Sequence, residues 1–203
     1  MSDLTRPFDL GSLGGTEPPL RPASRTQPRS ERRPVASNGS ADIGLLLLRV
    51  LVGGLFFVHG AQKVFGVLDG QGLGTTATNL AGYGFTSMSG ILAPVLGWTE
   101  MVAGGLLVLG LLTPVAAAAL LSISIVAVAV KWGDIPLFAS AGNESLEPDL
   151  LLGVGALALL FTGAGRAALD YGRAWQRRPL PYAWLFLVIS VAVAAAVFFL
   201  LRR

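Results

Sequence analysis

Residues 43–66 of the chain read IGLLLLRVLVGGLFFVHGAQKVFG. This stretch is long enough to cross a bilayer, because a spanning helix needs roughly 20 predominantly apolar residues. It nevertheless contains Arg49, His59, Gln62 and Lys63, and His59 is the only histidine of the chain. Polar groups inside hydrocarbon are costly, so they usually face a protein interior or a water-filled cavity. We therefore expect this segment to combine a membrane span with the residues that carry the chemistry.

The composition of the whole chain points to an integral membrane protein. Of its 203 residues, 53% are hydrophobic and only 13% are charged, whereas a soluble domain carries about 25% charged residues. The net charge of +3 does not indicate nucleic-acid binding, because the arginines flank apolar segments instead of forming a basic face with stacking aromatics. With no cysteine and one histidine, the chain is not expected to build a thiolate, zinc or haem site by itself, and we predict no metal site.

Five apolar segments predict an all-α, polytopic membrane protein: a four-helix transmembrane bundle with an additional C-terminal transmembrane helix. The segments cover residues 42–64, 90–112, 113–131, 148–164 and 182–201. The fourth is the shortest, and Thr113-Pro114 allows only a tight turn between the second and third. Helical spacing of apolar residues predicts one short helix near 73–82, in the loop 65–89.

The same reading divides the chain into four parts. Residues 1–41 are rich in Pro, Ser, Gly and Arg and are predicted to be a disordered cytoplasmic tail. Residues 42–172 form the four-helix membrane domain, residues 173–181 a basic cytoplasmic linker, and residues 182–203 the fifth transmembrane helix.

The distribution of arginine predicts the orientation in the membrane, because cytoplasmic loops carry an excess of Lys and Arg. The basic residues on the predicted inner side are Arg21, Arg25, Arg29, Arg32, Arg33, Arg166, Arg173, Arg177 and Arg178. The loop 132–149 contains four acids and no internal Lys or Arg, so it is expected outside. The N-terminus is thus predicted to be cytoplasmic and the C-terminus to lie outside, although Arg202 and Arg203 follow the last span.

Polar residues in the first two spans lie on faces that also carry small residues. At about 100° per residue, Arg49, Gly53, Phe56, Gly60 and Lys63 share one face, and His59 borders it. The second span has one charge, Glu100, and the same face carries Ala93, Gly97 and Gly104. Glycines on such a face let a neighbouring backbone approach closely, so we expect these two faces to meet.

We predict a buried pair between Arg49 and Glu100. Counting about 1.5 Å per residue, Arg49 lies about 10 to 12 Å from the inner end of its helix, and Glu100 about 15 Å from the outer end of its own. These depths nearly coincide in a core of about 30 Å. The pair would either lock two helices together or hold charges for a ligand.

A second polar cluster is predicted at the outer end, formed by His59, Lys63 and Lys131. It would bind an anionic group or a carboxylate from residues 144–149. The alternative is that both lysines extend their ammonium groups to the interface and that Trp132 is an ordinary interfacial aromatic.

Four stretches together resemble the DoxX family of small bacterial membrane proteins. They read LLLRVLVGGLFFVHGAQKVFG at 46–66, GYGF at 82–85, WTEMVAGGLLVLGLLTPVAAAALL at 98–121, and LLLGVGALALLFTGAGRAALDYG at 150–172. The resemblance implies a four-helix membrane bundle in the bacterial cytoplasmic (plasma) membrane. The residues that match the family's polar positions are Arg49, His59, Lys63, Glu100 and, at the inner end, Asp170. The tail 1–41 and the fifth span depart from the minimal family pattern.

The resemblance also implies a redox-associated role. Relatives in the wider group include a thiosulfate:quinone oxidoreductase subunit, and mycobacterial members are linked to a membrane complex with a superoxide dismutase and a sulfurtransferase. Because the chain shows no complete catalytic set, our first hypothesis is an accessory membrane component of a redox or oxidative-stress complex. It would organise soluble or membrane partner proteins at the inner face and would not be catalytic alone.

Two further hypotheses remain open from the sequence. The first is a quinone-interacting oxidoreductase subunit, in which Arg49, His59 and Glu100 line a pocket and a side chain donates a hydrogen bond to a quinone carbonyl; quinone is the one cofactor we consider. The second is a small-molecule transporter or proton relay, compatible with intramembrane Arg, His and Glu, although interrupted helices in corresponding halves are not evident. Each hypothesis is also compatible with a homo-oligomer of this chain.

Overall fold

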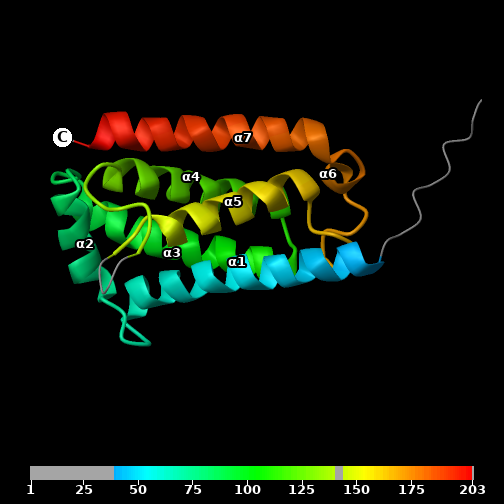
Figure 1. Ribbon diagram of the computed structural model, residues 1–203, viewed down its shortest axis with the longest axis horizontal. Helices are drawn as coiled ribbons and strands as arrows, with labels where there is room; N and C mark the ends of the chain where they lie inside the picture. The colour runs from blue at the N-terminus through cyan, green and yellow to red at the C-terminus, as the bar shows by residue number, and fades with distance from the viewer. Residues whose placement is uncertain (1–38, 140–143, 203) are drawn as a thin grey trace, which may run out of the picture. The chain divides into compact units, whose positions relative to one another are not determined.

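The computed structural model in Figure 1 describes residues 39–139 and 144–202 of the chain. These residues belong to one compact unit, Asn38–Arg203. The helices are α1 (Gly39–Phe65), α2 (Gly72–Gly82), α3 (Ser89–Leu109), α4 (Thr113–Lys131), α5 (Glu147–Thr162), α6 (Ala174–Arg177) and α7 (Pro179–Ala196), and α7 continues into a π-helical turn, Val197–Leu201. No strand occurs in this part of the chain. The tail predicted for residues 1–41 lies outside the described residues except for its last three, which begin α1.

Four helices are long and apolar enough to cross a membrane: α1, α3, α4, and α7 with its π-helical turn. This confirms the predicted all-α, polytopic membrane architecture. The predicted fourth span corresponds to α5, whose 16 residues fall short of the roughly 20 that a typical span needs. Figure 1 nevertheless shows α4 and α7 running in the same direction, with α5 returning between them. The chain therefore passes along the bundle five times, and α5 is its shortest pass.

Glycines bring the backbones of α1 and α3 into contact. A Cβ atom on Gly53 would lie 2.7 Å from the carbonyl oxygen of Gly104, and one on Gly60 would lie 2.6 Å from that of Gly97. Neither position can therefore carry a larger side chain without moving a backbone. Gly53 and Gly60 are buried together with Arg49 and Phe56, so the predicted inward face of the first span is confirmed.

The helix ends follow local signals in the sequence. Gly110 has φ +64° and ends α3, three residues before Thr113-Pro114 begins α4. The predicted second span, 90–112, was therefore too long at its C-terminal end, because a glycine in the left-handed region ends a helix readily. The predicted third span, 113–131, coincides with α4, and the short helix predicted near 73–82 is α2.

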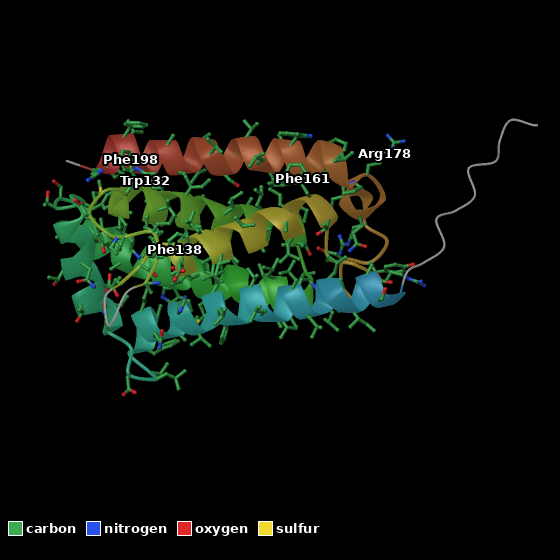
Figure 2. All side chains as sticks on the ribbon, viewed as in Figure 1. Trp132, Phe138, Phe161, Arg178 and Phe198 are labelled. Atoms are coloured by element: carbon green, nitrogen blue, oxygen red, sulfur yellow. The ribbon has the colours of Figure 1, made fainter. Side chains whose placement is uncertain are left out.

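The last helix packs on the bundle with few buried residues. Its Ser190 hydroxyl donates hydrogen bonds to the carbonyl oxygens of Ala118 (3.0 Å) and Phe186 (2.8 Å). At its C-terminal end, Arg202 Nε donates to the carbonyl oxygen of Tyr83 (3.0 Å), and the guanidinium lies over the ring of Phe198. Figure 2 shows Phe198, Trp132 and Phe138 toward one end of the bundle and Arg178 at the other.

The glycine contacts between α1 and α3 predict a specific sensitivity to side-chain size. Gly53→Leu should lower the thermal unfolding midpoint in detergent, because overpacking a close contact costs about 1–3 kcal/mol or more. The matched control is Gly54→Leu on the same helix, since a Cβ atom on Gly54 meets nothing within 4 Å. Thermal unfolding is followed by tryptophan fluorescence. Equal unfolding midpoints for the two variants would contradict the close approach of α1 and α3.

Candidate functional site

Arg49 and Asp170 form a fully buried cluster where α1, the α3–α4 turn and the segment after α5 meet. Arg49 Nη2 donates a hydrogen bond to the carbonyl oxygen of Ala167 (2.5 Å), and Asp170 is the charged group that acts on its guanidinium. Asp170 Oδ2 accepts hydrogen bonds from the Thr113 backbone N–H (2.8 Å) and hydroxyl (3.0 Å). The carboxylate thus satisfies a donor at the N-terminus of α4, where negative charge is favourable. We call these residues the Arg49–Asp170 cluster.

The predicted pair between Arg49 and Glu100 is wrong. Glu100 instead forms an ion pair and hydrogen bond with Lys63. The reason is the register of α1 against α3: Gly53 contacts Gly104, so Arg49, four residues earlier on an antiparallel helix, lies level with the end of α3. That level is about 12 Å along the axis from Glu100. The depths of Arg49 and Glu100 were counted from the ends of their own helices, and such a count does not contain the register of one helix against the other.

The other predicted polar residues surround one cavity of about 460 Å³, which we call the polar cavity. His59 and Lys63 reach it from α1, Glu100 from α3, Lys131 from α4 and Asp149 from α5. Its apolar wall residues include Phe56, Phe85, Leu92, Leu96, Val126 and Leu152. The structure therefore brings together His59, Lys63 and Lys131, as the sequence predicted, but adds Glu100 to the same site.

Both lysines of the polar cavity are paired with carboxylates. Lys63 contacts Glu100, and Lys131 Nζ lies 2.7 Å from Asp149 Oδ2. The Lys131 pair agrees with the expectation that a carboxylate from residues 144–149 joins this cluster. Since each positive charge has a negative partner, the cavity does not offer an unpaired lysine pair to an anion. Glu144 also lines the cavity, so carboxylates outnumber lysines there. These charges suit a neutral ligand with hydrogen-bonding groups better than a free anion.

His59 is the least engaged polar group of the cavity. It forms no hydrogen bond with any residue that the structure describes, and it is only half buried. A neutral imidazole offers one donor and one acceptor, so both are open to a ligand. By contrast, the neighbouring Gln62 points away from the cavity and donates to the carbonyl oxygen of Leu68 (3.1 Å). Gln62 does not line the cavity.

Three contributions to the site escaped the sequence analysis. The first is the polar side of α2, where Thr76 and Asn79 line the cavity and Asn79 donates to Gln71 Oε1 (2.7 Å); their spacing of three residues was a usable signal. The second is α7 with its π-helical turn, from which Val193, Ala194 and Val197 close one wall. The third is Thr113 as the partner of Asp170, for which no local pattern gives a signal.

Comparison with known proteins identifies the family of this chain. The DoxX family model matches residues 44–132, which run from the first turns of α1 to just after the end of α4. A Bacillus subtilis (strain 168) protein named "Putative oxidoreductase CatD" is 32% identical over 133 residues, covering 66% of this chain and 89% of that protein. This chain belongs to the DoxX family. With the four apolar helices, membership identifies a multi-pass membrane protein. No solved structure matches the chain.

Within this DoxX protein, the matched region and the polar residues overlap only in part. Residues 44–132 contain Arg49, His59, Lys63, Glu100 and Lys131. Asp149, which pairs with Lys131, and Asp170, whose charge acts on Arg49, lie beyond that region, as does the whole of α7. The polar cavity is therefore completed by segments outside the matched domain.

The Arg49–Asp170 cluster predicts a non-additive effect on stability. Arg49→Met or Asp170→Asn alone should destabilise the protein by about 3–5 kcal/mol, because each leaves the other charge buried without compensation. The double variant should lose clearly less than the sum, since neither charge remains. The measurement is the thermal unfolding midpoint of the four proteins, with exposed Asp134→Asn as control. Strictly additive losses would show that the two charges do not act on one another.

Proposed function

We propose that this protein is a membrane subunit of a redox system and that it binds a quinone, or an equally neutral redox-active molecule, in the polar cavity. The observation that carries the proposal is the cavity itself: about 460 Å³, apolar on most sides, with the unengaged His59 among two neutralised ion pairs. Ligand sites of about 300–1,000 Å³ with apolar walls and a few convergent polar groups are typical of small-molecule and cofactor binding. The oxidoreductase name of the Bacillus relative supports the redox assignment.

The chemistry of the lining fits a quinone headgroup. A quinone is uncharged, and its two carbonyl oxygens accept hydrogen bonds. His59 would donate to one of them, and the ammonium groups of Lys63 and Lys131 retain donors beyond those used by their carboxylate partners. Phe56 and Phe85 offer flat apolar surface to the ring. The residues of this chain would hold and orient the quinone, and a partner protein would supply or accept the electrons.

Removal of the His59 ring should weaken quinone binding. We expect His59→Ala to raise the Kd of a chain-free naphthoquinone or benzoquinone about five- to tenfold, since one hydrogen bond contributes about 1–1.5 kcal/mol. Gln62→Ala on the same helix should leave the Kd unchanged, because Gln62 is turned away from the cavity. Isothermal titration calorimetry in lipid nanodiscs measures both. Absence of binding to the wild type, or an equal loss in both variants, would refute the proposed site.

A second candidate function is the organisation of partner proteins at the basic end of the bundle. Arg166, Arg173 and Arg178 are exposed there, and the described residues provide none of them with an ion-pair partner. Arg166 lies over the exposed ring of Tyr171, at 6.0 Å from its centroid. This surface presents fixed positive charge beside aromatic area, which suits an acidic protein surface. In this proposal the basic end faces the cytoplasm, following the arginine distribution.

This second function predicts charge-dependent capture of partners. Neutralising Arg173, Arg177 and Arg178 and deleting residues 1–40 should release proteins that co-purify with the tagged protein from native membranes. Neutralising the exposed Asp69 and Asp134 at the opposite end is the matched control. If all partners stay bound after the arginines are neutralised and residues 1–40 are deleted, the proposal of docking at the basic end is wrong. That result would not bear on the proposed quinone site, which the quinone titration tests separately.

A further inference from the structure

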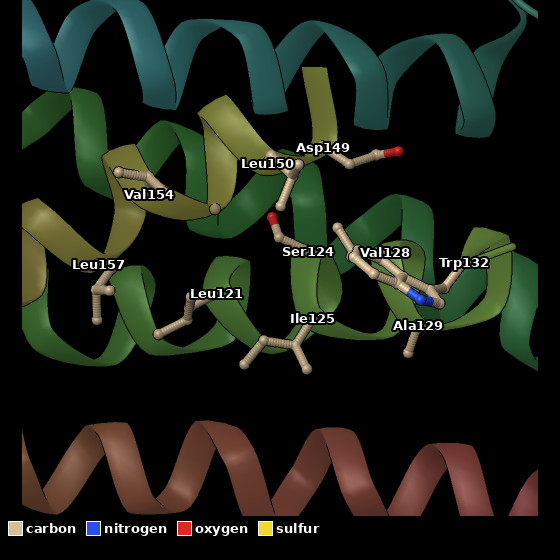
Figure 3. A pocket seen from close by; sticks show the side chains of 11 residues that line it. Leu121, Ser124, Ile125, Val128, Ala129, Trp132, Asp149, Leu150, Val154 and Leu157 are labelled. Atoms are coloured by element: carbon tan, nitrogen blue, oxygen red, sulfur yellow. The ribbon is translucent and has the colours of Figure 1, made fainter. Parts of the chain in front are cut away.

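A second cavity lies along α4 and α5, and its chemistry differs from that of the polar cavity. It has a volume of about 390 Å³, and Figure 3 shows its lining side chains arranged along the two helices. The apolar members include Leu121, Ile125, Val128, Leu150, Val154 and Leu157. Its polar side chains are Ser124 and Asp149 at the sides and the edge of Trp132 at one end. We call it the apolar groove.

The apolar groove and the polar cavity share two of their lining residues, Ser124 and Asp149. They occupy opposite faces of α4: Val128 lines the groove, while Ala127 lines the cavity. Figure 3 shows Ser124 directed to the space between α4 and α5, close to Leu150. The two cavities are thus neighbours separated by the seam between α4 and α5.

Two contacts bound this seam. On one side, Gly153 approaches Ser124 so closely that a Cβ atom on the glycine would lie 3.0 Å from the Ser124 Cβ. On the other side, Lys131 and Asp149 form their ion pair at 2.7 Å. Between them, α4 presents Ala127 and Val128, which are smaller than the leucines along the rest of the groove. The stretch of α4 between these two contacts therefore carries small side chains at the seam.

We propose that the apolar groove holds the isoprenoid chain of the quinone whose headgroup occupies the polar cavity. The proposal rests on the proposed quinone site and specifies its substrate as a lipid-soluble, long-chain quinone. A headgroup in the cavity has to direct its chain toward the bilayer, and the groove offers a mainly aliphatic path beginning at Ser124 and Asp149. Val154, which lines the groove on α5, is 61% exposed, so the groove reaches the lipid-facing surface.

The groove would contribute to quinone binding through its position beside the polar cavity more than through its hydrophobicity. Lipid tails are as apolar as leucine, so transfer of a chain from bilayer to groove has little hydrophobic driving force. Blocking the groove would instead act sterically, by leaving the attached chain without a path. The block should therefore affect long-chain quinones and spare chain-free ones.

The test compares two quinones that share one headgroup, one without a chain and one with a long isoprenoid chain. Each is titrated against wild-type protein in nanodiscs and against Val154→Trp, which fills the groove from α5. Ala129→Trp, which fills it from α4, provides a second variant in case the first does not fold. The matched control is Leu151→Trp, because Leu151 is 72% exposed on α5 and lines neither cavity.

We expect the groove variants to weaken long-chain binding at least tenfold, with chain-free binding unchanged and Leu151→Trp like wild type. Unchanged binding of the long-chain quinone in both folded groove variants would overturn the proposal. It would also be overturned if ordinary phospholipid acyl chains displaced the isoprenoid chain from the groove with no loss of quinone affinity. Failure of the chain-free quinone to bind wild-type protein would instead refute the quinone site itself. The two failures are therefore distinguishable.

Discussion

The close approach of α1 and α3 is the constraint on which the rest of the structure depends. At Gly53 and Gly60 on one helix, and Gly97 and Gly104 on the other, no side chain separates the two backbones. In a membrane, where apolar side chains gain little by leaving lipid, van der Waals contact of this kind is a main source of helix association. It also sets a single register, because sliding either helix by one residue would place side chains where only glycine fits. That register brings the side chain of Lys63 within reach of Glu100 and leaves Arg49 at the end of α3.

The two polar sites follow from this register and serve different purposes. At one level, Arg49 and Asp170 tie α1 and the segment after α5 to the start of α4, and Asp42 strengthens the same connection by accepting a hydrogen bond from the Arg166 N–H (3.1 Å). Arg49 and Asp170 are fully buried and bond to the backbone of Ala167 and Thr113, so this cluster holds these segments together. Ten residues further along α1 at His59, and fourteen at Lys63, the helix faces a cavity in which the imidazole of His59 has no hydrogen-bond partner among the described residues. The Arg49–Asp170 cluster and the polar cavity therefore lie toward opposite ends of α1, and the buried contacts of one are separate from the open space of the other.

The cavity also shows how segments outside the matched domain complete the site. Lys131 is the second-to-last residue of the region that the DoxX model covers, yet its partner Asp149 belongs to α5. The wall formed by Val193, Ala194 and Val197 comes from α7, whose end is held by the hydrogen bond from Arg202 to Tyr83. That bond also gives a structural role to an arginine that the charge distribution alone left unexplained. Neutralised lysines then turn a site that appeared suited to anions into one suited to a neutral ligand.

Sequence analysis by itself determined the membrane class, the helix segments and the inward faces of α1 and α3, because hydropathy, helical periodicity and the glycine and proline signals are local properties of the chain. It also placed His59, Lys63 and Lys131 near one another, since all three lie at corresponding ends of their helices. Only the tertiary structure decided which charges pair. Arg49, Glu100, Asp149 and Asp170 each have more than one partner of opposite charge within plausible reach, and the choice depends on a register that neither helix contains alone. Backbone contact between glycines on different helices sets that register, and through it the geometry of the site.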